Sequence, residues 1–191
     1  MEDNLGITVI NPEVESEFLA SRICYFAENI LAILLEANLL MRWCHRAFIL
    51  ALWRKGEPTP FIKTKVGTNF PSDDGFRENC WFLAEEKISR QLRNSHISSF
   101  QSRNFDQQEY GGAIAIPVGS ATWNIGIEGF YELEDEALAI LIAIYVFKIP
   151  LRYSWIQEIL DVKGNHELTE KLLAAVIAKD GGYYEKHIRV Q

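Results

Sequence analysis

The feature that most constrains how this chain folds is a β-hairpin followed by a helix that is apolar on nearly every side. Ala113 to Val118 and Ala121 to Glu128 flank Gly119-Ser120, a pair typical of a tight turn between antiparallel strands. The helix predicted over Ala137 to Phe147 carries no charged residue, so it should lie deep against the sheet. This combination favours an α+β fold in which a mostly antiparallel sheet is covered by helices.

The rest of the chain supplies a second hairpin and further helices. The apolar run Ala47 to Trp53 and the alternating run Pro60 to Val66 are separated by a strong turn signal around Gly56. Pro117 predicts an edge strand, because proline cannot donate a hydrogen bond to a neighbouring strand. Helices are predicted over Pro12 to Met41, Ser72 or Asp73 to Arg93, Glu132 to Phe147, Ser154 to Val162 and Glu167 to Lys179, and short strands over His96 to Gln101 and Tyr183 to Gln191.

This order of elements predicts one α+β core domain over residues 1–147. A C-terminal helical extension over residues 148–191 should pack on that core. The 191 residues fit a single domain, since two halves would each have a small core. A doubly wound nucleotide-binding fold would need strands that alternate with helices along the chain, and the predicted elements do not follow that order.

Charge and cysteine content argue against several classes of protein. The net charge is −7 and no run of basic residues is present, so binding to nucleic acid is disfavoured. Cys24, Cys44 and Cys80 are widely spaced and form no metal-ligand pattern, which predicts reduced thiols and no structural zinc. No signal-peptide pattern opens the chain, and the longest apolar run is about half of the ~20 residues that a membrane span requires. We therefore expect a soluble cytoplasmic protein without a membrane partner.

No motif of a known catalytic or cofactor-binding site is present. The chain lacks glycine-rich phosphate loops, a nucleophile elbow and the HExxH zinc pattern. His96 is the histidine predicted to lie between a central helix and the sheet, and Ser98 and Ser99 follow it as candidate pocket lining. The pair Gly111-Gly112 allows either a plain bulge or the close approach of a ligand to the backbone. No residue set supplies a nucleophile, a base and an orienting group together, so an enzyme is the weakest prediction.

An ordered series of short motifs resembles the haem-degrading-domain superfamily over about residues 18–147. The motifs are Gly67-Thr68, Trp81 with Lys87, Arg93 to Ser99, Glu109-Tyr110-Gly111-Gly112, Ile116-Pro117-Val118, Ile125-Gly126, Glu128-Gly129 and Glu134 to Leu138. That superfamily includes HbpS-type haem-binding proteins, GlcG-type proteins and the C-terminal domain of PduO-type proteins, and the chain is most similar to its small uncharacterised cytoplasmic branch. The resemblance implies a profilin-like sandwich that often assembles into homo-oligomers. Tyr110 and Glu136 stand where the branch has histidines, which implies that histidine-dependent chemistry is lost or altered here.

Two functions remain open from the sequence. The first is a non-catalytic small-molecule-binding module, with haem or another tetrapyrrole as the ligand that the resemblance implies. The alternative is an oligomeric scaffold or protein–protein interaction adaptor without a small-molecule ligand. Aromatic side chains around Pro150 would anchor such an interface unless they pack the extension on the core; they are Tyr145, Phe147, Tyr153 and Trp155. A ligand pocket would be lined by His96, Ser98, Ser99, Tyr110, Gly111, Gly112 and Glu136.

Overall fold

Four antiparallel strands form the centre of the structure, in the order β2-β1-β4-β3. The computed structural model describes residues 12–40, 46–68, 74–107 and 109–189. Within these residues the two predicted hairpins are confirmed, and Pro117 lies on an edge strand where its missing N–H is tolerated. The strands are β1 (Ala47–Arg54), β2 (Ile62–Gly67), β3 (Ala113–Val118) and β4 (Ala121–Glu128).

β1 is a central strand that is buried on both faces. It pairs antiparallel with β2 and with β4, and its residues from Ala47 to Leu52 are fully inaccessible. Alternate side chains point to opposite faces of a strand. Phe48 and Leu50 therefore belong to the large hydrophobic cluster on one face, and Ile49 belongs to a smaller cluster on the other. Burial on both faces explains why this strand reads as a continuous apolar run.

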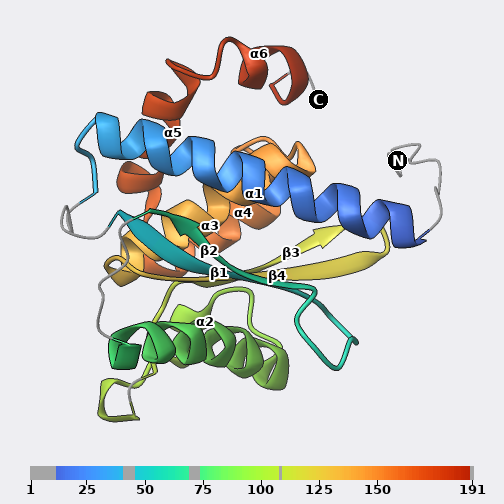
Figure 1. Cartoon of the computed structure of the whole chain (residues 1–191), viewed down its shortest axis with the longest axis vertical. Helices are drawn as coiled ribbons and strands as arrows, with labels where there is room; N and C mark the ends of the chain where they lie inside the picture. The colour runs from blue at the N-terminus through green and yellow to red at the C-terminus, as the bar shows by residue number, and fades with distance from the viewer. Residues whose placement is uncertain (1–11, 41–45, 69–73, 108, 190–191) are drawn as a thin grey trace.

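Two helices, α1 (Pro12–Glu36) and α3 (Glu132–Phe147), cover one face of the sheet (Figure 1). Every residue of α3 from Glu134 to Val146 is buried, since the helix is packed against the sheet, α1 and the C-terminal helices. The prediction of a deeply buried helix is confirmed, and the larger hydrophobic cluster forms around it.

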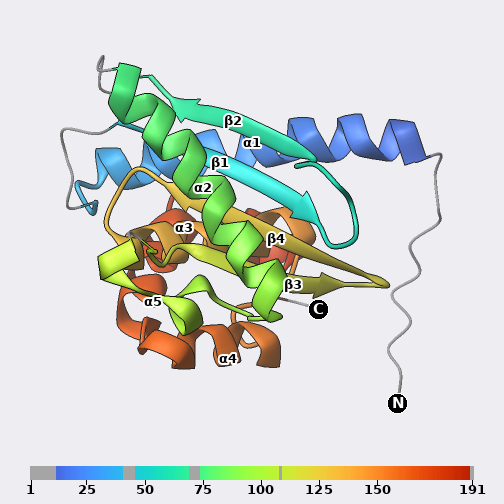
Figure 2. The same cartoon turned by 90° about the horizontal axis from the view of Figure 1, so that it is seen from below.

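A single helix, α2 (Asp74–Asn94), crosses the opposite face of the sheet (Figure 2). Gly126 of β4 lets the helix approach the sheet closely. A Cβ atom added at Gly126 of β4 would lie 2.6 Å from the carbonyl oxygen of Ala84. The helix and sheet layers give the α+β class that the sequence predicts, with helices over both faces of an antiparallel sheet.

Three helices follow α3 and lie on its side of the sheet: α4 (Ser154–Lys163), α5 (His166–Ile177) and α6 (Tyr183–His187). The aromatic residues around Pro150 join these helices to the core. Trp155 donates its indole N–H to the carbonyl oxygen of Ala115 at 2.7 Å, and the Tyr145 hydroxyl donates to Asp180 at 2.6 Å. These contacts use the aromatic side chains for packing within the chain.

The strand predicted over His96 to Gln101 is wrong. This segment makes a single bridge between Ser98 and Ile114 and then turns into a 3₁₀ helix, η1 (Ser99–Ser102). The side chain of Gln101 accepts hydrogen bonds from the two backbone N–H groups of Ile97 and Ser98. That local capping stabilises the turn and stops the segment from continuing along the edge of β3.

The strand predicted over Tyr183 to Gln191 is also wrong, because α6 forms there within the described residues. Asp180 accepts hydrogen bonds from the backbone N–H groups of Gly182, Tyr183 and Tyr184. A carboxylate that caps three free N–H groups favours a helical turn. The first helix ends at Glu36, so its predicted continuation is wrong over residues 37–40, where the chain turns at Asn38 with φ of +52°. Met41, the predicted caps Ser72 and Asp73, and Cys44 lie outside the described residues.

Helix α1 is unusually apolar for a helix at a surface. The stretch from Phe18 to Glu36 has a mean hydropathy of 1.6 over 19 residues, which would suffice to cross a membrane by length and composition alone. One face of this stretch is buried in the core, including Ile23 and Leu34, while Tyr25 is exposed. Core helices have the same composition, so the cytoplasmic location stays a prediction.

Candidate functional site

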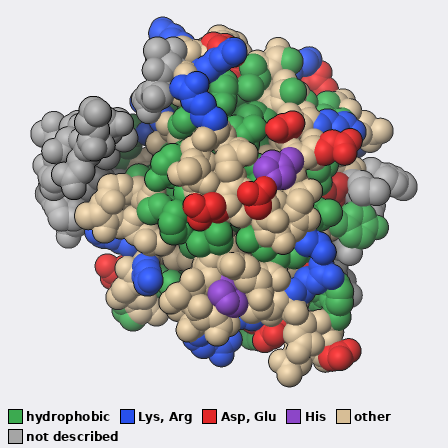
Figure 3. Space-filling view, turned by 180° about the vertical axis from the view of Figure 1, so that it is seen from behind, with side chains coloured by type: hydrophobic (Ala, Val, Ile, Leu, Met, Phe, Trp, Pro, Cys, Tyr) green, Lys and Arg blue, Asp and Glu red, His purple; other side chains and the backbone are tan. Residues whose placement is uncertain are grey.

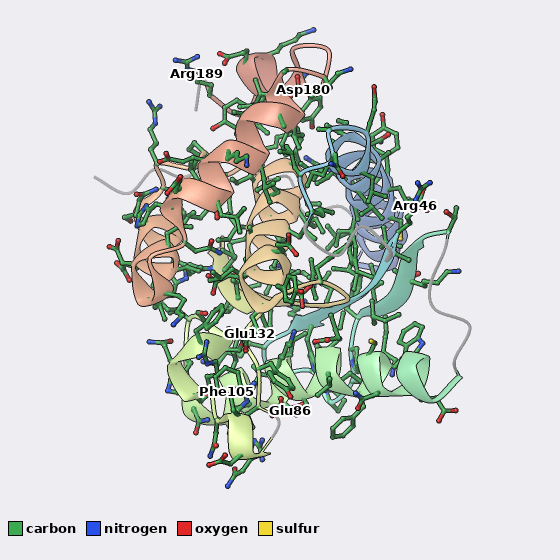
Figure 4. The ribbon with its side chains drawn as sticks, turned by 90° about the vertical axis from the view of Figure 1, so that its left-hand side faces the viewer. Arg46, Glu86, Phe105, Glu132, Asp180 and Arg189 are labelled. Atoms are coloured by element: carbon green, nitrogen blue, oxygen red, sulfur yellow. The ribbon has the colours of Figure 1, made fainter. Side chains whose placement is uncertain are left out.

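The residues predicted to line a pocket gather where β3 begins, between α2 and the first turn of α3. Figure 4 shows this end of the molecule, where the labelled side chains of Glu86, Phe105 and Glu132 lie. Most of the predicted residues are buried and two are half-buried at the margin. The buried ones are Ser98, Ser99, Gly111, Gly112 and Glu136, and the half-buried ones are His96 and Tyr110.

Glu136 joins the segment after α2 to the C-terminal extension. Its Oε2 atom accepts a hydrogen bond from the Ser98 hydroxyl at 2.5 Å, and its Oε1 atom accepts one from the Asn165 amide at 3.3 Å. Among the residues that the structure describes, no basic side chain bonds to it. Burial raises the pKa of Glu136 to about 7, against the lowering effect of the hydrogen bonds from Ser98 and Asn165. The carboxyl group predicted to meet a ligand is therefore occupied by the protein's own side chains.

A buried ammonium group lies directly under Gly112. Lys87, on α2, bonds to Glu128 at 2.6 Å, to Asp135 at 3.2 Å and to the carbonyl oxygen of Ile127 at 2.7 Å. A Cβ atom at Gly112, where φ is +105°, would lie 2.8 Å from this ammonium and 2.7 Å from the Cβ of Asp135. Gly112 is thus required because the Lys87 cluster occupies the space a side chain would need.

The Lys87 cluster holds one cation against two carboxylates. Burial alone would lower the pKa of Lys87, but Glu128 and Asp135 outweigh that effect and the pKa is raised. Burial raises the pKa of Asp135 to about 7, although the ammonium opposes that shift. The ammonium has two carboxylate partners, so its own pKa is raised. Asp135 shares the ammonium with Glu128, which makes the shorter contact, so the ammonium offsets the effect of burial on the pKa of Asp135 only in part.

A second buried cation, Arg90, organises the segment that leads into β3. Its guanidinium pairs with Glu86 at 2.9 Å and donates to the carbonyl oxygens of Ser99, Ser102 and Tyr110 at 3.0, 2.9 and 2.6 Å. The planar fork of arginine suits such multiple contacts. One side chain from α2 therefore holds both ends of the 99–110 segment.

The backbone beside the glycine pair also bonds to several side chains. The N–H of Gly111 donates to Glu132 at 2.8 Å, and the N–H of Ala113 donates to the Ser99 hydroxyl at 2.9 Å. The Gln91 amide donates to the carbonyl oxygen of Ala113 at 3.1 Å. These contacts satisfy the polar groups that an incoming ligand would use.

Two hollows in the described part of the chain lie elsewhere. One of about 680 Å³ is lined by residues at the end of α1 and around Arg46, and one of about 490 Å³ lies beside Trp81 on α2. None of the predicted pocket residues lines either hollow. Within the described residues, no group of three or more His, Cys, Asp or Glu side chains is arranged to hold a metal ion.

A few buried polar atoms at this end have no hydrogen-bond partner among the described residues. They are the Nδ1 atom of His96, the Oε1 atom of Gln91, the Oδ1 atom of Asn165 and the hydroxyl of Thr169. Such atoms are uncommon in folded proteins and mark places where a further polar group can bind. His96 is the one among them that the sequence also predicts as a ligand-binding residue.

The cations at the centre of this network were missed as site residues. Arg93 belongs to the motif series, but it is exposed, and Arg90 is the arginine that is buried. Arg90 and Lys87 lie three residues apart, so they are neighbours on the helix surface. Lys87 directly precedes Ile88 on the apolar seam of α2. A lysine beside an apolar seam is the sequence signal that would have indicated a buried ion pair.

Comparisons with known proteins find no family model, no curated protein and no solved structure that matches the chain.

Replacing Lys87 by methionine should strongly destabilise the protein. The substitution leaves the buried carboxylate of Asp135 and the half-buried carboxylate of Glu128 without their cation, so the free energy of unfolding should fall by about 3–5 kcal/mol. Chemical denaturation followed by circular dichroism measures the change. Lys63→Met is the matched control, because the Lys63–Glu85 pair is about one-third exposed and exposed pairs contribute about 0–1 kcal/mol. Equal losses in the two variants would contradict the buried cluster.

Stability should fall as the pH rises from about 5 to about 8. The pKa of Glu136 is about 7 in the folded protein and 4.5 as the ordinary value, so the folded state binds the proton more tightly and ionisation at higher pH costs stability. Glu136→Gln should remove about 1–3 kcal/mol of this fall, measured by urea denaturation at a series of pH values. Glu158→Gln, at an exposed position on α4, is the control. An unchanged pH slope in Glu136→Gln would refute the assignment.

Proposed function

We propose that this chain is a non-catalytic interaction module that assembles with a second copy of itself. The contact surface would be the Phe105 patch, which consists of Arg103, Phe105, Tyr110 and Glu132. The observation that supports the proposal is an exposed aromatic ring that lies against an arginine side chain. Phe105 is 56% exposed, and the Arg103 guanidinium lies 4.0 Å from the centre of its ring.

The composition of the patch is typical of residues that dominate binding energy at interfaces. The ring of Tyr110 lies 6.0 Å from that of Phe105, and Arg103 pairs with Glu132 at 3.0 Å. Tyrosine, arginine and other aromatic residues are enriched among hot spots, since they combine large apolar area with directional polar groups. An isolated exposed phenylalanine would carry less weight than this connected group.

The patch is also held rigid by the buried network beneath it. Arg90 binds the carbonyl oxygen of Tyr110, and Glu132 binds both Arg103 and the N–H of Gly111. A surface fixed in advance loses little conformational entropy on binding. The polar contacts that fill the predicted pocket therefore support a role in which the protein is recognised from outside.

A second copy suits the patch because it carries both signs of charge. In a two-fold contact the same surface is used on both molecules, so Arg103 of each copy can pair with Glu132 of the other. The resemblance to a superfamily whose members often form homo-oligomers supports the same partner. On the face seen from behind, acidic and basic side chains are likewise interspersed (Figure 3).

Binding of haem or another tetrapyrrole is the second candidate. The observation that favours it is the half-buried His96, whose Nδ1 atom has no partner among the described residues. Imidazole nitrogen is a common axial ligand of haem iron, and Tyr110 lies at the same end of the sheet. For this role the 99–110 segment would have to move, because Arg90 now holds it against α2.

Replacing Phe105 by serine should abolish self-association. Sedimentation velocity over a range of protein concentrations should show a concentration-dependent dimer for the native chain and a monomer for Phe105→Ser. Phe82→Ser is the matched control, because Phe82 is 63% exposed on α2 and lies outside the patch. The proposal would be falsified if the native chain were monomeric throughout, or if Phe82→Ser alone dissociated the dimer.

Titration with haem tests the second candidate. If His96 binds the iron, the native protein should shift the Soret band and His96→Ala should weaken that shift at least tenfold in affinity, roughly the loss of one coordinating group. Tyr110→Phe should weaken it less if the phenol only supports the site. Absence of a shift in the native protein, or an equal shift in His96→Ala, would reject the role.

A further inference from the structure

A hollow between α2 and the edge strand β2 combines aromatic rings with carboxylates. It measures about 490 Å³ and is lined by Lys63, Glu78, Trp81, Phe82 and Glu85. The α2 residues among these are spaced three, four and seven positions after the first, so they form one stripe on the helix surface. Helix α2 crosses the face of the sheet opposite to α1 and α3 (Figure 2).

The hollow already holds one cation from the chain itself. The Lys63 ammonium lies 5.0 Å from the centre of the Trp81 ring and 2.5 Å from Glu85. A cation over an aromatic face with a carboxylate beside it is the usual arrangement for recognising an ammonium group. Lys63 and Glu85 are both about one-third exposed, so this internal contact is open to exchange with solvent or with another molecule.

The hollow contains a carboxylate and an aromatic ring in addition to those that Lys63 contacts. Glu78 has no ion-pair partner among the described residues, which leaves two carboxylates against one ammonium. Phe82, next to Trp81, is 63% exposed. The unpaired charge and the open ring are together complementary to a basic side chain with an apolar stem.

We propose that this hollow, here named the Trp81 hollow, binds a lysine side chain of a basic segment in a partner protein. The incoming ammonium takes the place of Lys63 over the Trp81 ring, with Glu78 and Glu85 on either side and the lysine stem against Phe82. Lys63 then acts as an internal competitor that weakens binding until a partner displaces it. This inference is independent of the Phe105 patch, whose residues do not line the hollow.

Tetralysine peptide with blocked ends serves as the probe, and its fully acetylated form as the neutral control. Titration is followed by NMR through the indole N–H signal of Trp81, identified by its loss in Trp81→Phe. The Phe105→Ser background keeps the protein monomeric, so failure of this test is separate from failure of the proposed self-association. Tetralysine should shift the Trp81 signal, and the acetylated peptide should not.

Removing the internal competitor gives the sharpest result. Lys63→Gln should tighten tetralysine binding about three- to fivefold, the size expected for one exposed cation–π contact. Lys65→Gln is the matched control, because it removes the same charge two residues further along β2, outside the hollow. Glu78→Gln should weaken binding about two- to threefold by removing the carboxylate that has no internal partner.

Two results would overturn the proposal. One is an unmoved Trp81 signal at millimolar tetralysine in both the native hollow and Lys63→Gln. The other is an equal change of affinity in Lys63→Gln and Lys65→Gln, which would mean that only the overall charge matters. Circular dichroism of each variant establishes that its fold is retained, since all of these positions are at least partly exposed.

Discussion

The structure depends on the contacts that two buried cations of α2, Lys87 and Arg90, make with carboxylates and carbonyl groups. Lys87 and Arg90 are each about 1% exposed, and an unpaired charge at such depth would cost several kcal/mol. Each cation therefore needs partners, and it finds them in segments that are distant along the chain: the end of β4, the first turn of α3 and the carbonyl groups of the 99–110 segment. Helix α2 is thus joined to three segments that lie near the start of β3.

The same pairing decides what kind of function the end of the sheet can support. The ammonium of Lys87 fills the space that a side chain at Gly112 would need, and the Ser98 hydroxyl donates a hydrogen bond to the carboxyl group of Glu136. A ligand would have to replace these contacts with equally good ones, which is costly in a buried site. The groups that remain available are on the surface, and they are aromatic rings held against charged side chains, at Phe105 and at Trp81. Self-association through the Phe105 patch and lysine binding at the Trp81 hollow are therefore both recognition from outside the fold.

Much of the fold could be read from the sequence, because the strongest patterns reflect burial that any packing must satisfy. The hairpin of β3 and β4 and the apolar helix α3 follow directly from alternation and from a charge-free run. The segments that were predicted wrongly are short and depend on particular side-chain caps, from Gln101 in one case and Asp180 in the other. The residues predicted to line a pocket do gather at one end of the sheet. The buried network among them was not predicted, since it depends on where α2 directs Arg90, which contacts segments that are distant along the chain.

The buried network around Lys87 and Arg90 closes the space beside Gly111 and Gly112 to a ligand. Native-state hydrogen exchange of the Gly111 and Ala113 amide protons, measured by NMR, tests this closure most directly, because their acceptors are the side chains of Glu132 and Ser99. We predict that both protons exchange only through global unfolding, so that their free energy of opening equals that of the Leu50 amide in the central strand. Exchange orders of magnitude faster than that of Leu50 would show that this end of the sheet opens on its own, and would restore the case for a ligand pocket there.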